Sequence, residues 1–256
     1  MKKQILFIAV TISAILFSCS KEKIETPQTT TTGELSQITV PGPGPITIDP
    51  LGIDLAGWFK FNGDLKDQMG KLADGQRWPL SRVSGATFTY DRKGIANAAL
   101  KFDGNYYVTI ANAPVQQNMS LSLWVRKFAT NIGNAGSIVR HNSTGMEVNQ
   151  LDNQFWGRVM SYADNFSQTS IFSTDFPDTK WHHIVITYSA DRMKMYVDNQ
   201  LQGNTSNTFT VLDKFTKYLL GYAHGSAGKY WKGEIDDLRF YNRTLTATDV
   251  QALYNY

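Results

Sequence analysis

The sequence predicts an all-β domain, a sandwich or jelly roll, and three observations favour that class. Apolar residues from Leu51 to Tyr256 recur mainly with a period of two, as in "LSLWVRKF" and "WHHIVITYS". Both runs are rich in β-branched and aromatic residues, and clusters of Gly, Asn and Asp bound them. The stretch "KMYVDNQLQG" is typical of two strands joined by a tight turn at Asp198 and Asn199, which tolerate positive φ.

One helix is predicted, close to the C-terminal end of the sequence. Thr246 can cap the segment "ATDVQALY", and Asp249 three residues later completes the pattern of a capping box. Val250, Leu253 and Tyr254 then form one apolar face, which we expect to pack on the sheets.

Three segments are predicted along the chain. Residues 1–18 have the form of a signal peptide, because Lys2 and Lys3 precede an apolar run that is too short to cross a bilayer as a helix. Residues 19–50 are rich in Thr, Pro and Gly and are expected to form a flexible tether. Residues 51–256 hold all six tryptophans and are long enough to bury one sizeable core, so they are expected to form a single domain.

Cys19 is the single cysteine of the chain, and it directly follows the residues "LFS" at the end of the apolar run. This arrangement resembles the bacterial lipobox, in which a lipid is attached to the thiol and the chain is cut just before the cysteine. The resemblance implies a Bacteroidetes-type outer-membrane lipoprotein, at the cell surface or facing the periplasm, that contacts the membrane only through its lipid anchor. The alternative is an ordinary secretory signal. A catalytic thiol is not favoured, because no fold surrounds Cys19 to hold a histidine within reach.

The charge balance bears on the class of partner. The chain has 25 basic and 22 acidic residues, and two of the lysines lie in the predicted signal peptide. A nucleic-acid partner normally requires a clustered basic face, which the sequence lacks. We therefore expect no nucleic-acid ligand.

Five motifs occur in the order seen in laminin-G-like domains of the concanavalin A-like lectin/glucanase superfamily. The resemblance extends from about Gly57 to the end of the sequence, and it implies a two-sheet antiparallel jelly roll with a short C-terminal helix. It does not imply one activity, because this fold hosts lectins, adhesion modules and glycoside hydrolases. The motifs are "GWFKFNGDLKDQMGK", "KGIANAALKFDGNYYVTI", "MSLSLWVRK", "KWHHIVITYSADRMKMYVDNQ" and "WKGEIDDLRFYNRTLTATDVQALY".

A hydrolase of this superfamily needs a nucleophile and an acid/base on one face of a strand, about 5 Å apart. In "EIDDLRF", Glu234 and Asp236 share a face, but the next same-face positions are Leu238 and Phe240. The second catalytic carboxylate is therefore missing, and we expect a non-catalytic domain. A glycoside hydrolase or lyase remains an alternative.

The resemblance also implies one structural Ca²⁺, bound where the loop "NGDLKD" meets the strand "IDD". A calcium ion takes several oxygens from carboxylates and backbone carbonyls. The alternative is that Asp64 only makes a turn and that Asp237 pairs with Arg239 or Arg243. The candidate metal ligands are Asp64, Asp67, Asp236 and Asp237.

His182 and His183 are adjacent on a predicted strand, so their side chains point to opposite faces. They cannot hold one metal ion together, and we expect structural roles for both.

Aromatic and polar residues around two segments predict a ligand-binding site. Aromatic faces stack on the apolar faces of sugars, while Arg, Asn and His bond hydroxyl groups, so a glycan is the expected partner. An extracellular or surface protein is the alternative partner, with the domain acting in adhesion or assembly. The same alternation of residues also suits a strand that lines a core. The candidate ligand-binding residues are Trp156, Arg158, Tyr222, His224, Tyr230 and Trp231.

Overall fold

The computed structural model describes residues 50–78, 86–128, 136–142, 144–161, 166–207, 209, 211, 214–222 and 230–256. The predicted signal peptide, Cys19 and nearly all of the predicted tether lie outside the described residues, as does His224.

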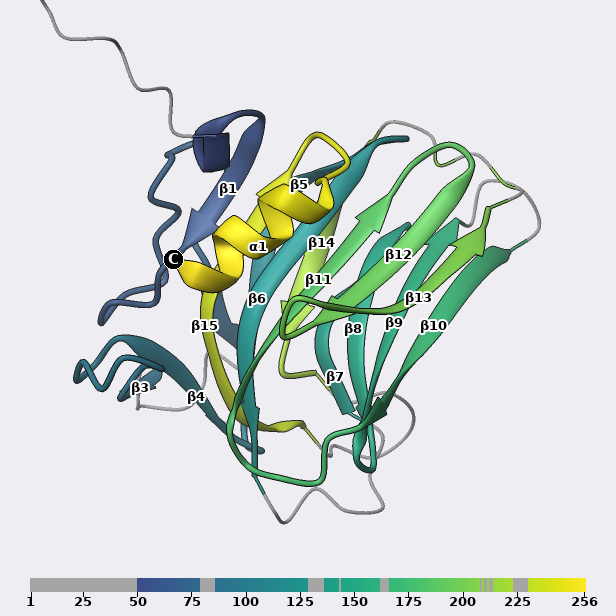
Figure 1. Cartoon of the computed structure of the whole chain (residues 1–256). Coiled ribbons are helices and arrows are strands. Elements are labelled where there is room, and N and C mark those ends of the chain that lie inside the picture. The colour runs from purple at the N-terminus through teal and green to yellow at the C-terminus, as the bar shows by residue number, and fades with distance from the viewer. Residues whose placement is uncertain are drawn as a thin grey trace, which may run out of the picture. The chain divides into compact units, whose positions relative to one another are not determined.

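Two antiparallel sheets pack face to face (Figure 1), so the predicted two-sheet antiparallel jelly roll is confirmed. Sheet A has the order β13-β12-β11-β6-β15-β4-β3, with β1 also paired to β15, and sheet B has the order β10-β9-β8-β7-β14-β5-β2. The strands of sheet A are β1 (Leu55–Phe59), β3 (Thr87–Thr89), β4 (Ala99–Asp103), β6 (Met119–Lys127), β11 (Trp181–Tyr188), β12 (Arg192–Val197), β13 (Gln200–Ser206) and β15 (Lys232–Tyr241). The strands of sheet B are β2 (Gln76–Trp78), β5 (Tyr107–Val115), β7 (Gly136–His141), β8 (Gly145–Leu151), β9 (Gln154–Ser161), β10 (Ser167–Asp175) and β14 (Lys214–Leu220).

Strand β6 shows how the period of two builds the core. Leu121, Leu123 and Val125 are fully buried in the main hydrophobic cluster between the sheets. The intervening Ser122 and Trp124 therefore point to the outer face of sheet A. The same alternation on the strands of both sheets supplies the inner layer of apolar side chains.

Helix α1 (Ala247–Asn255) begins with the predicted capping box, formed by Thr246 and Asp249, and the turn helix η1 (Pro50–Gly52) lies at the start of the domain. Val250 and Leu253 are buried in a second cluster with Val185, which projects from the outer face of β11. Figure 1 shows α1 lying across this face of sheet A. The helix thus covers sheet A on its solvent side.

The predicted turn at Asp198 and Asn199 is also present, between β12 and β13. Both residues have positive φ, 49° and 62°, as a two-residue hairpin turn of this type requires.

Strand β15 contains a β-bulge that changes the expected pattern of faces. Its register against β6 shifts between Asp236 and Arg239, and Asp237 has a φ of 52°. Because of the extra residue, Leu238 lies in the core with Ile235, and Arg239 takes the outer face. The expectation that Leu238 shares a face with Glu234 and Asp236 is therefore wrong.

Candidate functional site

The predicted carboxylates of β15 lie on the outer face of sheet A, where they pair with two arginines. Arg92 places Nη1 2.5 Å from Asp236 Oδ2 and Nη2 3.3 Å from Asp237 Oδ2. Arg239 donates to both oxygens of Asp237, each at 3.1 Å. Burial raises the pKa of Asp236 to about 7 despite the neighbouring Arg92 guanidinium. We call Arg92, Asp236, Asp237 and Arg239 the sheet A cluster.

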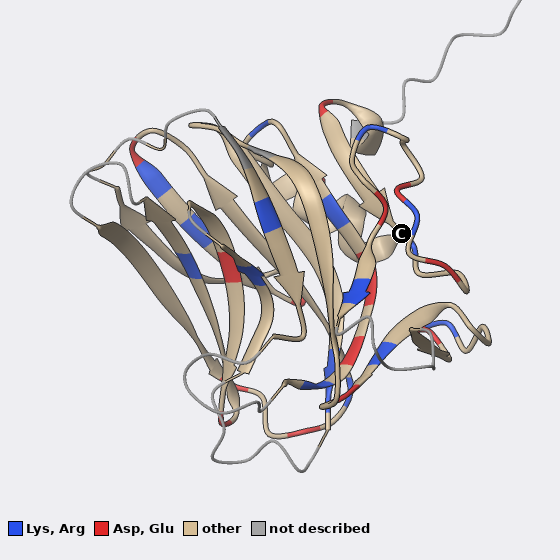
Figure 2. Ribbon diagram, turned by 180° about the vertical axis from the view of Figure 1, so that it is seen from behind, with Lys and Arg blue, Asp and Glu red and all other residues tan. Residues whose placement is uncertain are grey.

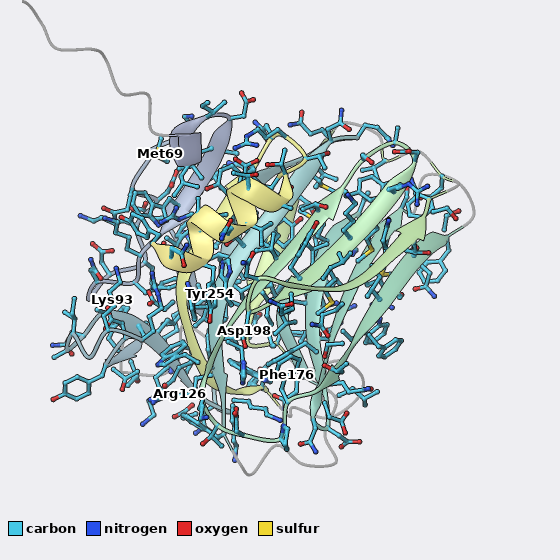
Figure 3. All side chains as sticks on the ribbon, viewed as in Figure 1. Met69, Lys93, Arg126, Phe176, Asp198 and Tyr254 are labelled. Atoms are coloured by element: carbon cyan, nitrogen blue, oxygen red, sulfur yellow. The ribbon has the colours of Figure 1, made fainter. Side chains whose placement is uncertain are left out.

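Aromatic rings cover the sheet A cluster. The Arg92 guanidinium lies 4.8 Å from the Trp124 ring centroid, and Trp124 stacks on Tyr254 of α1 at 5.6 Å. Arg239 lies over the rings of Trp58 and Tyr256, at 4.4 and 4.3 Å. Tyr254, labelled in Figure 3, belongs to the last turn of α1 and lies over this face of the sheet. The cluster is consequently closed off from solvent.

Asp67 and Asp64 are also engaged, in a loop that follows β1. The Asp64 carboxylate accepts a hydrogen bond from the Lys66 N–H at 3.1 Å, as in a turn. The Asp67 carboxylate accepts four backbone N–H groups, at 2.8 to 3.1 Å, from Trp58, Met69, Lys71 and Leu72.

These contacts bear on the predicted calcium ion. Asp237 pairs with Arg239, as in the alternative interpretation, whereas Arg243 pairs with Asp249 at 2.7 Å. Among the described residues, no group of three or more His, Cys, Asp or Glu side chains is arranged to hold a metal ion. Two of the candidate ligands already have partners at both carboxylate oxygens: N–H groups occupy those of Asp67, and guanidinium groups those of Asp237. Calcium binding stays a prediction.

Glu234 points to the same outer face as Asp236, and it too has a guanidinium partner. Arg126 Nε donates to Glu234 Oε2 at 2.5 Å, and the Arg126 guanidinium lies 5.3 Å from the Trp181 ring (Figure 3 labels Arg126). Each carboxylate of the pair considered for hydrolysis is thus held by its own arginine.

The outer face of sheet B carries a second buried charge cluster, centred on Glu147 of β8. Arg158 stands directly opposite on β9. Its Nε donates to Glu147 at 3.0 Å, its Nη2 donates to the same carboxylate, and its Nη1 donates to Gln168 at 3.2 Å. Glu147 is only 1% exposed and Arg158 6%. All three nitrogens of the Arg158 guanidinium are therefore satisfied.

Arg140 of β7 approaches Glu147 from the other side and is held differently. Its Nε lies 3.6 Å from Glu147 Oε1, and its guanidinium lies 5.9 Å from the Tyr222 ring. The Arg140 side chain is 27% exposed. Within the part of the chain that the structure describes, neither Nη1 nor Nη2 of Arg140 has a hydrogen-bond partner. Arg140 thus keeps free donors at a partly exposed position.

Polar side chains beside Glu147 complete the arrangement. Asn149 donates to Glu147 at 3.4 Å and accepts from the Ser137 hydroxyl at 2.7 Å, and His141 Nε2 lies 3.5 Å from the carboxylate. We call these residues the Glu147 network: Ser137, Arg140, His141, Glu147, Asn149 and Arg158.

Aromatic residues lie on both sides of the Glu147 network. On β9 and β10, Trp156 and Phe172 stack at 5.3 Å with an interplanar angle of 5°. The Arg158 guanidinium lies 4.7 Å from the same Trp156 ring. Arg158 and Phe172 therefore occupy the two faces of Trp156, and Phe172, 48% exposed, presents the outermost ring.

On the other side, Tyr107, Tyr222 and Tyr230 form what we call the tyrosine trio. Tyr107 lies 4.9 Å from Tyr222 and 5.5 Å from Tyr230, and Tyr222 and Tyr230 are 6.0 Å apart. All three rings are partly exposed. Figure 2 views the molecule from the side of sheet B, whose strands carry more basic than acidic residues.

The structure brings four of the six predicted ligand residues to this face: Trp156, Arg158, Tyr222 and Tyr230. Trp231 is different, because it is 3% exposed and lies in the core, where it donates to Gln150 at 2.9 Å. A ring packed between two sheets cannot stack on a ligand, so we leave Trp231 out of the site. His224 lies outside the described residues.

Sequence reasoning missed three residues of this face: Tyr107, Arg140 and Phe172. Each lies on a strand with an ordinary alternating pattern, and only strand pairing places it beside the others. The pairing of Phe172 with Trp156 across β10 and β9 is one example. The alternation in "TSIFSTD" could have indicated that Phe172 is exposed, but not that Trp156 lies beside it.

Comparison with known proteins identifies similar chains. The family model Laminin_G_3, of the concanavalin A-like lectin/glucanases superfamily, matches residues 102–251. The non-toxic nonhemagglutinin of Paraclostridium bifermentans is 33% identical over 96 residues, which is 35% of this chain and 8% of that protein.

Solved structures share the fold at low identity. One, from work on the dependence of botulinum neurotoxin type C cell entry on two ganglioside molecules, has a TM-score of 0.63 and 15% identity, over 79% of this chain and 51% of that one. The binding domain of botulinum neurotoxin DC in complex with rat synaptotagmin II has a TM-score of 0.60 and 16% identity, over the same shares. This chain spans about half the length of those solved chains. Across the described residues, no helix has the length and apolar character that a membrane-spanning helix needs.

Proposed function

Because the chain belongs to the concanavalin A-like lectin/glucanase superfamily, whose fold hosts several activities, we propose from the site itself that this domain binds glycans on the outer face of sheet B. The observation that carries the proposal is the pair of partly exposed aromatic platforms, Phe172 on one side and the tyrosine trio on the other, around a fixed guanidinium. Flat apolar rings flanking a few fixed polar groups are typical of carbohydrate sites.

The extent of this face suits an oligosaccharide. Phe172 lies on β10 and Tyr222 directly follows β14, and three strands separate these two, so their backbones are roughly 19 Å apart at about 4.8 Å per strand spacing. We infer that a chain of sugars can contact both platforms, with Phe172 and Tyr222 as the stacking residues. Trp156 stacks on Phe172, and the Arg158 guanidinium lies over Trp156. These two residues therefore hold Phe172 in place and do not themselves stack on the ligand.

The solved relatives are compatible with this proposal. The neurotoxin type C work concerns ganglioside molecules, and the DC domain was solved with a synaptotagmin. The DC structure is a binding domain, and both solved chains match this chain over only about half of their length. They therefore favour a binding role but do not identify the ligand of this chain.

A glycan array followed by calorimetry on the strongest ligand tests the proposal. We expect Phe172→Ala and Tyr222→Ala each to weaken binding about tenfold, since one lost aromatic contact is worth about 1 kcal/mol or more. Tyr90→Ala is the matched control, because Tyr90 is a more exposed aromatic residue that follows β3 of sheet A. Absence of any bound glycan, or equal losses in all three variants, would contradict the proposal.

A surface protein is the second candidate partner, and the synaptotagmin complex of a domain with the same fold is the observation that favours it. An adhesion or assembly module would use the exposed Phe172 as an anchor for a protein side chain. Crosslinking on intact cells distinguishes this case, because it would recover one protein whose capture Phe172→Ala abolishes while no glycan binds.

We also propose that the domain is displayed on the envelope through a lipid on Cys19, with residues 20–50 as the tether. The lipobox-like segment before Cys19 supports this proposal. Cys19→Ser should leave the domain folded but release it from the membrane fraction, which fractionation and circular dichroism measure. Retention of the variant in the membrane fraction would contradict the anchor.

A further inference from the structure

We propose that the glycan bound by sheet B carries a carboxylate and that Arg140 binds it. This inference rests on the proposed glycan-binding function and adds the chemical class of the ligand. The Glu147 network has more guanidinium groups than carboxylates.

The network contains two guanidinium groups and one carboxylate. Arg140 and Arg158 both approach Glu147, and His141 Nε2, 3.5 Å from the carboxylate, adds a positive charge when it is protonated. The described contacts supply no second carboxylate to either arginine. Among the described residues, the site therefore has an excess positive charge, and a ligand that brings one negative charge would balance it.

The two arginines differ in what they can offer. Arg158 is buried, and Glu147 and Gln168 already occupy its three nitrogens. Arg140 is partly exposed and has only its Nε near the carboxylate. Arg140 is consequently the residue that can reach a ligand without breaking a contact.

The way Arg140 is held also points to the kind of anion. With Nε turned toward Glu147, the edge of the guanidinium formed by Nη1 and Nη2 is left without a partner among the described residues. That edge presents two parallel N–H donors, which match the two oxygens of a carboxylate. Glu147 thus fixes the arginine before a ligand arrives, and this reduces the entropy lost on binding.

The neighbouring ring indicates that the anion is part of a sugar. Arg140 lies over Tyr222 of the tyrosine trio, so a carboxylate on its outer edge would sit beside partly exposed aromatic rings. A carboxylate-bearing sugar ring could stack there while its carboxylate pairs with Arg140. A free carboxylate would not use the rings.

The test is an array of uronate-containing and sialylated glycans, each printed beside its carboxyl-reduced counterpart. We expect carboxyl reduction to weaken binding to the wild-type protein by about tenfold or more, the usual effect of losing a charge-assisted hydrogen bond. Arg140→Gln should abolish the preference for the carboxylated glycan, so that this variant binds the carboxylated glycan and its reduced counterpart equally. Arg140→Lys keeps the positive charge but loses the two parallel N–H donors. Its affinity for the carboxylated glycan should lie between those of the wild-type protein and Arg140→Gln.

Arg192→Gln is the matched control, because Arg192 is an exposed arginine on β12 of sheet A. Thermal unfolding of each variant checks that the domain remains folded. If glycans bind but carboxylated ones bind no better than reduced ones, the inference is overturned and glycan binding stands. If sulfated glycans bind as tightly as carboxylated ones and Arg140→Gln abolishes both, the carboxylate assignment is overturned. If no glycan binds at all, the proposed function fails and this inference fails with it.

Discussion

The outer faces of the two sheets both carry buried carboxylates paired with arginines, but the two groups differ in charge balance and in how aromatic rings cover them. In the sheet A cluster, two aspartates meet two arginines, and rings from β6 and the C-terminal segment lie over them. In the Glu147 network, one glutamate meets two arginines, and the aromatic rings lie beside the charges. The first group is balanced and covered, whereas the second has donors left over at a partly exposed position.

This difference separates a structural charge cluster from the proposed binding site. Burial of ion pairs is costly unless every charge is matched, so a balanced and covered cluster is best explained as part of the fold. An excess charge held in place by its neighbours is unfavourable for the free protein and is relieved when a ligand of opposite charge binds. The comparison makes five predictions, from the largest effect to the smallest.

Removal of the central carboxylate of sheet B should have the largest effect. Glu147→Ala leaves the buried Arg158 without its partner, and we expect a loss of about 3 to 5 kcal/mol in the free energy of unfolding. Urea denaturation measures the loss. The double variant Glu147→Met with Arg158→Met should recover much of it, since it removes both charges. A loss below about 1 kcal/mol for Glu147→Ala would show that Glu147 does not hold the network.

The corresponding change in sheet A should be smaller. Asp237→Ala unpairs Arg239, but Arg92 can keep its contact with Asp236, so we expect a loss of about 2 to 3 kcal/mol. Affinity for the glycan should not change in this variant, because the cluster lies on the opposite sheet. A parallel loss of glycan affinity would remove the distinction between the two faces.

The aromatic cover of sheet A can be tested through the adjacent histidines of β11. Burial lowers the pKa of His183, on the covered face, to about 3. His182 faces the core side, where burial alone would lower its pKa, but hydrogen bonds to Asp198 (2.7 Å) and Asp178 (2.8 Å) raise it. An NMR titration should therefore find opposite shifts, and Tyr254→Ala should move only the pKa of His183 toward 6.5. An unchanged His183 in that variant would mean that Tyr254 is not the cover.

The two histidines also contribute with opposite signs to the pH dependence of the free energy of unfolding. The contribution of His182 is fully present below its ordinary pKa of about 6.5 and is lost as the pH rises through its raised value. His183 favours the neutral form, so its contribution is present above about 6.5 and is lost as the pH falls toward 3. His182→Asn should flatten only the alkaline side of a stability profile measured by urea denaturation at several pH values.

Calcium should have the smallest effect. The pairing of Asp67 with N–H groups and of Asp237 with guanidinium groups predicts that calcium added to metal-stripped protein leaves its melting temperature unchanged. If the predicted ion binds, a hundredfold excess of calcium over Kd should instead stabilise the domain by about 2.7 kcal/mol. A calcium titration monitored by thermal unfolding distinguishes the two.

Local signals were enough to predict the class of fold, the hairpin turn and the helix cap. The cap depends on two residues three positions apart, Thr246 and Asp249, and the turn on Asp198 and Asn199 alone. The bulge at Asp237 depends on how β15 pairs with β6, so the expected faces beyond Asp236 were wrong. Likewise, the pairing of β7 with β8 brings Arg140 to Glu147. The packing of the two sheets against each other buries Trp231.

The pairing of β15 has a consequence for how the domain folds during synthesis. This strand pairs with β1, β4 and β6, and its contacts include Leu238 with Phe59 and Phe240 with Leu121. All three partner strands are synthesised well before β15, so their facing edges have no partner until the ribosome reaches Lys232–Tyr241. Contacts this distant along the chain slow folding, and unpaired strand edges favour aggregation in the meantime. A nascent chain of this domain therefore stays exposed to chaperones and proteases until β15 has emerged.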